Sequence, residues 1–406
     1  MAKHDLIVGL DIGSGTIKML VASKKPNEDA LEVLSFAQEP SIGVRKGVVI
    51  DPEKVSEQIS LLIKRVEEQI NKRISSVYVN VGGSHVFSTN SRGLVSVSRA
   101  DQKISQEDIE RVLQAAQTFS LPPNREILEV FPREFIIDGE KGIKSVEGLK
   151  GVRLEAEVLL LGAFTPYVKN LTTAVLNSGI QKINDLIFSP LASARAVLSS
   201  KEKELGVVLL DIGAGTTNLA IFEEGELVNM SILPIGSSHI TNDLAIYLKT
   251  DTEIAERIKI DYGSVLFQGQ DKKEKIKFDE KEILTFSLKK ISRVIEDRVL
   301  EIFREVIKEL KKAGKTELPA GIVLTGGCAK IPKIKELAKK EFHLPSRVGS
   351  AKGFVSLQDD YCLSVVCGLV LLGFDEQSQE GNWGKPISGE FGFMERIKKI
   401  FKIFVP

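Results

Sequence analysis

Two aspartates, Asp11 and Asp211, each open a short glycine-containing turn that follows an apolar run. The glycines of each turn can take positive φ without a Cβ penalty and leave room for a ligand, so successive backbone N–H groups can converge on an anion. Neighbouring hydroxyls add donors that suit phosphate oxygens, and a hydrated Mg²⁺ would remove the repulsion between carboxylate and phosphate. The pattern therefore predicts a magnesium and phosphate site built from Asp11, Gly13, Ser14, Gly15, Thr16, Lys18, Asp211, Gly213, Ala214, Gly215, Thr216, Thr217 and Asn218.

The first turn (residues 11–18) and the second turn (residues 211–218) lie about half a chain length apart, with Asp, Ile, Gly, Gly and Thr in register. A single copy is also typical of an ordinary tight hairpin, but a repeat at this spacing favours two related halves. The copies differ in charge at one position. Lys18 supplies a cation for the outer phosphates, whereas Asn218 at the matching position is neutral.

A third glycine-containing element follows an apolar run at residues 322–324. Gly326 and Gly327 let the backbone approach a flat ligand, and we expect a helix starting near Pro332 to present its positive end there. The candidate ligand-binding residues of this loop also include Cys328 and Lys330.

Glu256 and Lys259 lie three residues apart on a helix that we expect Thr252 to cap. The spacing suits gripping a ribose and base together, and it equally suits a solvated ion pair. Gly236 follows a strand predicted over 227–234, where it would face the same ligand.

Short apolar runs predict the strands that carry the turns. Residues 207–210 are all aliphatic, which is typical of a strand buried on both faces, and a similar run precedes Asp11. Asp51 and Pro52 predict the start of an amphipathic helix that continues to about Ile70. The small side chains of 190–198 predict a closely packed helix, either at a hinge or in an ordinary helix contact.

Between residues 77 and 161 the pattern changes to alternating runs around a single helix, with no phosphate turn. We interpret this region as an inserted subdomain, which serves protein contacts or is purely structural. Its helix is expected over 106–119, capped by Ser105, and its strands over 86–89, 94–97, 127–137 and 152–161. Farther along we expect a charged loop over 271–277, then a long helix from about Glu280 to Lys312 that exposes Lys289, Lys290, Arg293 and Arg298.

The composition is that of an ordinary globular protein, with 43% apolar and 27% charged residues in a chain of 406. Its 55 basic and 55 acidic residues balance, so no bulk attraction to nucleic acid is indicated. No signal peptide or transmembrane run is evident, and the three cysteines lack the spacing of a zinc site or disulfide framework. We therefore expect a reducing, cytosolic setting.

The two turns, the helix 190–198 and the Gly326 loop together resemble the phosphate, connecting and adenosine motifs of the actin, sugar kinase and heat-shock chaperone ATPase superfamily. Within it, residues 43–47, 90–93, 122–137 and 151–157 resemble FtsA, a family of bacterial actin homologues of cell division. The resemblance implies an α/β protein with a duplicated ribonuclease H-like (actin-like ATPase) fold and an inserted small α+β subdomain. The expected division is 1–82 and 163–199 for the first actin-like subdomain, 83–162 for the insert, 200–242 and 316–375 for the second actin-like subdomain, 243–315 for a small nucleotide- and partner-binding subdomain, 376–391 for a linker and 392–406 for an amphipathic helix.

By this resemblance, Asp11 and Asp211 hold the hydrated magnesium of bound ATP, and Glu256 and Lys259 meet adenosine opposite the Gly326 loop. One departure concerns catalysis. Superfamily hydrolases usually place Gln or Glu just before the connecting helix to orient the attacking water, whereas this chain has Ser189. We therefore expect ATP binding with at most weak ATPase activity.

The chain ends in a polar linker followed by a segment with an apolar face and a basic face. Its aromatic and aliphatic side chains recur at helical spacing, and the cations lie opposite, as in helices that lie in the plane of a membrane surface. A terminal helix docked on the body or on a partner is the alternative. The residues expected to bind anionic lipid are Phe393, Ile397, Ile400, Phe401 and Phe404 on one face with Lys398, Lys399 and Lys402 on the other.

The resemblance to FtsA implies an ATP-binding protein that polymerises on the cytoplasmic face of the bacterial inner membrane at the division septum. It would anchor the FtsZ ring, recruit later division proteins, and accept the FtsZ C-terminal tail at Lys289, Lys290 and Arg298. Two alternatives share the fold: a type IV pilus assembly platform, and a small-molecule kinase. The kinase needs a catalytic carboxylate in a substrate cleft, and none is evident outside the turns.

Overall fold

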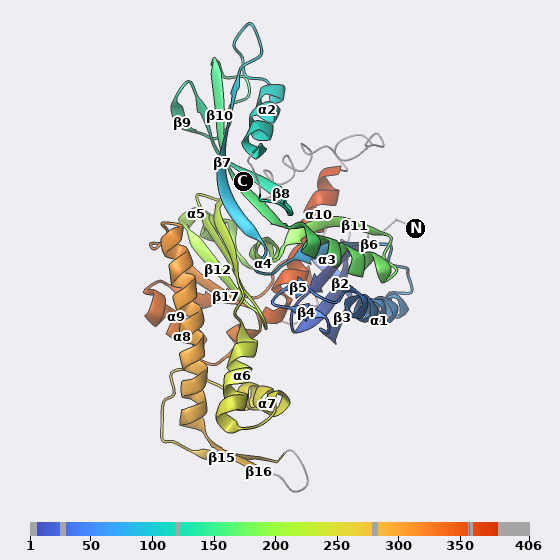
Figure 1. The fold of residues 1–406 in the computed structure, drawn as a ribbon, viewed down its shortest axis with the longest axis vertical. Coiled ribbons are helices and arrows are strands. Elements are labelled where there is room, and N and C mark those ends of the chain that lie inside the picture. Colours follow the sequence, from blue (N-terminus) through green and yellow to red (C-terminus); the bar gives the residue numbers. More distant parts are fainter. Residues whose placement is uncertain are drawn as a thin grey trace.

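The computed structural model describes residues 6–24, 30–118, 122–277, 283–355, 357 and 360–380. Two sheets of like topology form the middle of the molecule (Figure 1). A small α+β subdomain projects at one end, and a group of helices with a short hairpin projects at the other. The predicted amphipathic tail, 392–406, lies outside the described residues.

The first half of the molecule is built on a six-stranded sheet in the order β11-β6-β1-β2-β3-β19. β1, β6 and β11 are parallel, and β2 runs antiparallel to both β1 and β3. The strands are β1 (Ile7–Ile12), β2 (Thr16–Lys24), β3 (Leu31–Pro40), β6 (Ser76–Val81), β11 (Lys182–Phe188) and β19 (Phe354–Val355).

The second half repeats this arrangement in a five-stranded sheet, β14-β13-β12-β17-β18. β12, β17 and β18 are parallel, and β13 runs antiparallel to β12 and β14, so each strand has a counterpart in the first sheet. The strands are β12 (Val207–Ile212), β13 (Thr217–Glu223), β14 (Glu226–Leu233), β17 (Gly321–Thr325) and β18 (Ser346–Val348). The duplication predicted from the two turns is therefore a duplication of the whole sheet.

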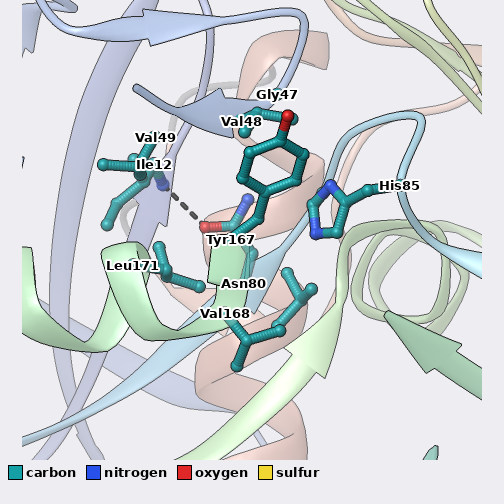
Figure 2. Close-up of a pocket in the computed structure, with 11 residues that line it drawn as sticks. Ile12, Gly47, Val48, Val49, Asn80, His85, Tyr167, Val168 and Leu171 are labelled. Atoms are coloured by element: carbon teal, nitrogen blue, oxygen red, sulfur yellow. Dashed lines mark hydrogen bonds between the residues drawn. The ribbon is translucent and has the colours of Figure 1, made fainter. Parts of the chain in front are cut away.

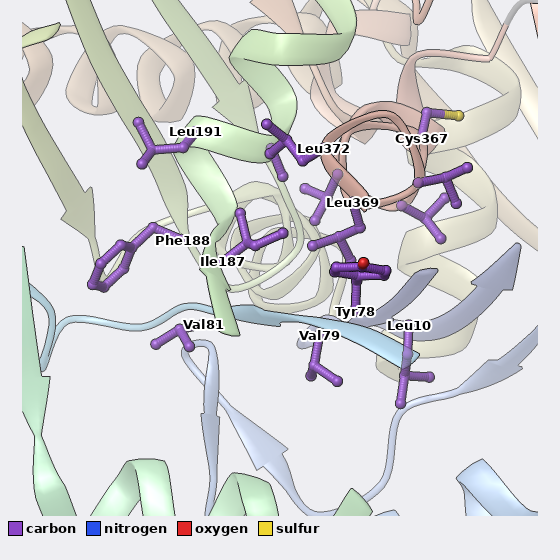
Figure 3. Packing of buried hydrophobic residues seen from close by; sticks show 14 of the residues in the cluster. Leu10, Tyr78, Val79, Val81, Ile187, Phe188, Leu191, Cys367, Leu369 and Leu372 are labelled. Atoms are coloured by element: carbon purple, nitrogen blue, oxygen red, sulfur yellow. The ribbon is translucent and has the colours of Figure 1, made fainter. Parts of the chain in front are cut away.

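Two helices, α4 (Ser189–Val197) and α10 (Ser364–Glu380), pack on each other, α10 against the first sheet and α4 against β12 and β13. A Cβ at Gly368 would lie 1.8 Å from the backbone oxygen of Ala192, so the small residues do permit the close approach expected of them. Figure 3 shows Leu369 and Leu372 of α10 in the same apolar layer as Tyr78 of β6. This layer joins the two halves, because one core cluster takes in residues of both sheets.

The outer faces of the sheets are covered by further helices. On the first half, α1 (Pro52–Ile70) packs on α3 (Thr165–Asn177) and on β2 and β3. The predicted cap is confirmed, because Asp51 accepts a hydrogen bond from the Lys54 N–H at 3.2 Å. The second half carries α5 (Ser200–Leu205) and α9 (Ile334–Phe342). Residues 207–210 are fully buried, as predicted for a strand covered on both faces.

The inserted subdomain is a four-stranded antiparallel sheet with one helix, α2 (Gln106–Gln117), packed on it. Its order is β7-β10-β8-β9, with β7 (Phe87–Ser96), β8 (Arg125–Ile137), β9 (Glu140–Ile143) and β10 (Arg153–Phe164). The two short strands expected over 86–89 and 94–97 are one continuous strand, because β10 pairs with β7 along its whole length. The capping box between Ser105 and Asp108 is confirmed.

The helical group at the other end contains α6 (Ser237–Leu248), α7 (Thr252–Tyr262) and α8 (Leu288–Lys312). Three local predictions are corrected here. Asp251, not Thr252, caps α7, accepting from the Ile254 N–H at 2.8 Å. The expected loop 271–277 contains β15 (Lys273–Lys277), which pairs with β16 (Ile283–Ser287), so α8 begins at Leu288 and not near Glu280.

No helix within the described part of the chain is both long enough and apolar enough to span a membrane.

Candidate functional site

The two predicted turns close in the same way. Asp11 lies across its hairpin from Lys18, and Asp211 across its hairpin from Asn218. In the first turn the Gly13 N–H donates to the backbone oxygen of Thr16 at 3.1 Å. The matching bond in the second turn, from Gly213 to Thr216, measures 2.9 Å.

Tertiary structure brings the tips of the two turns into contact. A Cβ at Gly15 would lie 2.8 Å from the Cβ of Ala214, and a Cβ at Gly215 would lie 2.7 Å from the Ser14 Oγ. None of the four turn glycines has positive φ, so the turns do not use the conformational freedom that glycine allows. Glycine is needed at Gly15 and Gly215 because a side chain there would push the two halves apart.

The two aspartates are buried, each 4% exposed, and have different partners. The Lys18 Nζ lies 3.1 Å from Asp11 Oδ2, so the cation expected on the outer phosphates pairs with a carboxylate. Burial opposes a charged Lys18, but Asp11 outweighs this and raises the pKa of the ammonium group. Asp211 Oδ2 accepts from the Ser193 Oγ at 2.7 Å, and burial raises the pKa of Asp211 above its usual value.

Around Asp211 the donor set suits a hydrated magnesium ion. The buried Asn218 Oδ1 has no hydrogen-bond donor among the described residues, and a metal-bound water would supply one. A Cβ at Gly326 would lie 2.4 Å from Asp211 Oδ1, so glycine keeps that oxygen uncovered. The described residues include no group of three or more metal-ligating side chains. Magnesium that is held by one or two carboxylates, phosphates and water needs no such group.

The Gly326 loop lies beside the second turn, where a Cβ at Gly326 would be 2.7 Å from the Ile212 oxygen. A short 3₁₀ turn (Gly327–Lys330) follows Gly326 at once, and α9 starts at Ile334, near Pro332 as predicted. Gly326 has φ 82°, which favours glycine, and its N–H donates to the backbone oxygen of Tyr361 at 2.9 Å. Lys330 pairs with Asp360 at 2.9 Å.

Cys328, in the same loop, is buried. Burial raises the pKa of its thiol to about 12, so the sulfur stays protonated at neutral pH. We therefore assign Cys328 a packing role and no chemistry of its own.

Glu256 and Lys259 are brought to the second turn through α6. The Lys259 Nζ lies 2.6 Å from Glu256 Oε2 and 2.9 Å from the Thr241 Oγ1 of α6. The first turn of α6 is tied to the phosphate turn, since the Ser237 N–H donates to the Gly213 oxygen at 2.8 Å. Gly236 lies against the same turn, where a Cβ would be 2.6 Å from the Ala214 oxygen.

Two residues of α4 make contacts that sequence reasoning missed. Ser193 holds Asp211, although its place in a small-residue helix gave no hint of a polar role. Ser189, where a water-orienting residue is usual, is buried, accepts from the Asn80 Nδ2 at 3.0 Å and donates to the Val81 oxygen. Asn80 in turn accepts from the Ile12 N–H at 2.7 Å, so these side chains brace the strand of the first turn.

A small pocket lies at the end of β1, lined by Ile12, Gly47, Asn80, His85 and Tyr167 among others (Figure 2). The rings of His85 and Tyr167 meet edge to face, with centroids 5.1 Å apart. The buried His85 Nδ1 has no hydrogen-bond partner within the described structure, and burial lowers the pKa of the imidazole to about 4. The histidine is therefore neutral at physiological pH.

The cations predicted to bind a partner lie on α8, which is a different element from the two turns. Lys289 and Lys290 are exposed in its first turn. Arg298 is not a free surface cation, because its guanidinium binds both oxygens of Asp243, at 2.6 and 2.9 Å, and also Glu301. A partner carboxylate would have to compete with these bonds.

Comparison with known proteins adds sequence matches to this geometry. The family profile described as "Cell division protein FtsA" matches residues 208–366, and one described as "SHS2 domain inserted in FTSA" matches residues 83–161. The chain is 37% identical over 380 residues to the cell division protein FtsA of Pseudomonas aeruginosa, a match covering 92% of this chain and 90% of that protein. To FtsA of Bacillus subtilis it is 34% identical over 375 residues, covering 91% and 84%.

Solved structures show the same fold at lower identity. A chain of a PilM-PilN type IV pilus biogenesis complex superposes with a TM-score of 0.65 at 18% identity, covering 90% of this chain and 98% of that one. MreB5 of Spiroplasma citri, solved bound to ADP, gives a TM-score of 0.56 at 14% identity, covering 93% and 98%. The predicted actin-like fold with an inserted subdomain is therefore confirmed.

Proposed function

This chain belongs to the FtsA family of cell division proteins, and we propose that it acts there as an ATP-bound adaptor between a membrane and the FtsZ ring. One observation carries the nucleotide part of this proposal. Two duplicated turns meet tip to tip, with a buried carboxylate behind each. Gly13 to Thr16 and Gly213 to Thr217 would hold the phosphates, and Asp11 and Asp211 the magnesium through water.

On this proposal, adenosine binds between the Gly326 loop and α7. Glu256 and Lys259 form an ion pair, as one of the two alternatives for their spacing predicted. The pair is not fully solvated, because Lys259 is buried and also bonded to Thr241. The Lys259 side chain is 9% exposed and the Glu256 side chain 43%, so the pair is half-buried, and the bonds of both side chains to Thr241 hold its geometry better than that of a fully solvated pair. It therefore presents a fixed polar edge to the ribose and base.

Asp211→Asn tests the metal part of the site. The amide keeps the shape of the carboxylate and an oxygen that Ser193 can reach, but it lacks the negative charge. We expect ATP affinity, measured by competition with a fluorescent nucleotide, to fall roughly tenfold with Mg²⁺ and to change little with EDTA. Asp101→Asn, an exposed change in the inserted subdomain, is the matched control. Equal ATP affinity of Asp211→Asn and the unaltered protein in Mg²⁺ would refute the assignment.

We further propose that turnover of the bound ATP is slow. The hydroxyl of Ser189 is short and already engaged with Asn80 and the Val81 oxygen, so it is poorly placed to orient an attacking water. Steady-state phosphate release slower than about one per second supports this, and release at ordinary enzyme rates contradicts it.

Filament formation, membrane attachment and tethering of FtsZ complete the proposed function. The family assignment and the two-faced tail sequence support attachment at the inner membrane, and the exposed Lys289 and Lys290 support capture of an acidic FtsZ tail. Recruitment of later division proteins rests on family membership alone. The similarity to the pilus protein does not support the alternative of a pilus assembly platform, because a match at 18% identity shows a shared fold and not a shared function.

A further inference from the structure

A tight hairpin of the first half reaches the place where the two phosphate turns meet. β4 (Val44–Arg45) and β5 (Val48–Val49) pair antiparallel, leaving Lys46 and Gly47 as a two-residue loop. The Gly47 N–H donates to the Ser14 Oγ of the first turn at 2.7 Å. A Cβ at Gly215 of the second turn would lie 3.4 Å from the Lys46 Cα. The hairpin tip is therefore a third element at the junction of the halves.

Lys46 takes an uncommon backbone conformation at this tip. Its φ is 51° and that of Gly47 is 75°, the pattern of a hairpin turn that usually has Asn or Asp followed by Gly. A lysine in this region of φ is mildly strained, and such strain concentrates at functional sites. The chain thus places a long cationic side chain where turn geometry alone would favour a short neutral one.

Three other lysines near the turns already have anionic partners. Lys18 pairs with Asp11, Lys259 with Glu256 and Lys330 with Asp360. Lys46 is exposed, and within the described structure no hydrogen bond or ion pair of its ammonium group is recorded. A lysine on a flexible four-carbon stem next to two phosphate-binding turns is free to follow an incoming anion.

We propose that Lys46, at the tip of the β4–β5 hairpin, binds the terminal phosphate of a nucleoside triphosphate that spans both turns. This inference rests on the proposed nucleotide binding and deepens it. The Gly236 side of the site touches the second turn at Gly213 and Ala214, whereas Lys46 touches it at Gly215, next to Ser14 of the other half. Lys46 therefore lies where the two turns meet, which is the place that this proposal gives to the terminal phosphate. Because a diphosphate lacks that phosphate, Lys46 favours binding of a triphosphate.

Lys46→Asn removes the charge and retains the turn, because asparagine tolerates positive φ. We expect Mg²⁺-ATP affinity to fall roughly tenfold and ADP affinity to change less than about threefold, measured by competition with a fluorescent nucleotide. Lys46→Arg should restore most of the ATP affinity. Arg45→Gln, which makes the same charge change one residue earlier, should bind both nucleotides as the unaltered protein does. Thermal unfolding without nucleotide checks that the fold of each variant is intact.

Three results would overturn the inference while leaving nucleotide binding in place: unchanged ATP affinity in Lys46→Asn, equal loss of ATP and ADP, or an equal effect in Arg45→Gln. If the unaltered chain bound neither nucleotide, the proposed function itself would fail and this inference with it.

Discussion

Lys18 and Asn218 occupy the same register position in the two duplicated hairpins, each directly across from its aspartate. The Lys18 ammonium lies 3.1 Å from Asp11 Oδ2, whereas the Asn218 Nδ2 lies 3.4 Å from Asp211 Oδ2 and brings no charge. The charge of Asp11 in the first turn is thus balanced by Lys18, whereas Asp211 in the second turn has no cation at the matching position. We infer that Asp211 contributes more than Asp11 to holding a bound cation.

Lys18→Met should destabilise the protein even without ligand. The substitution leaves Asp11 buried and without its cation, which costs about 3 kcal/mol in free energy of unfolding. Urea unfolding followed by circular dichroism measures the change. Lys54→Met, which breaks the exposed pair with Asp51, is the control and should alter stability little. Coincident unfolding curves for Lys18→Met and the parent would show that the pair is not a stabilising one.

His85 should make stability fall in mild acid. Its folded pKa is about 4, while the unfolded imidazole titrates near 6.5, so between these values the unfolded chain binds the extra proton. Stability is therefore lost as pH falls from about 6.5 to about 4, on the order of 3 kcal/mol in total. His85→Phe retains a ring beside Tyr167 and removes the titration. The difference in urea midpoint between parent and variant should thus depend on pH, and a constant difference would contradict the prediction.

Lys289→Glu with Lys290→Glu should weaken binding of the FtsZ C-terminal tail peptide roughly tenfold at low salt, because both cations are exposed on α8. Fluorescence anisotropy of a labelled peptide measures this. Arg298→Glu is a poorer test, since it would place a third carboxylate beside Asp243 and Glu301 and disturb the fold. Lys311→Glu, at the far end of the same helix, should bind the peptide normally. Equal weakening by the Lys311 change would point to general electrostatics and not to a site.

Replacing Lys398, Lys399 and Lys402 by Glu should abolish co-sedimentation with anionic liposomes, because each basic residue near such a surface contributes about 1 kcal/mol. The substitutions leave the apolar face of the tail and every residue of the proposed nucleotide site unchanged, so nucleotide binding should persist. Neutral liposomes serve as the matched control for charge. Undiminished sedimentation with anionic liposomes would rule out the tail as the electrostatic anchor.

Local features were predictable from the sequence because their partners are near in the chain. The hairpin that pairs Asp11 with Lys18, the Asp51 cap and the Ser105 capping box each depend on interactions within seven residues. Errors arose where a second local arrangement competed with the predicted one. Asp251 displaced Thr252 as a cap, and β15 paired with residues that otherwise resemble the start of a helix.

The sequence by itself determined the two aspartate turns, their strands and the duplication, since these follow from residue type and short-range periodicity. Only the tertiary structure decided that Gly15 meets Ala214, that Ser193 holds Asp211 and that Lys46 lies against Gly215. The physical reason is that contacts between distant segments depend on how the sheets and helices pack, and packing reflects the shape of the whole interior more than any short pattern.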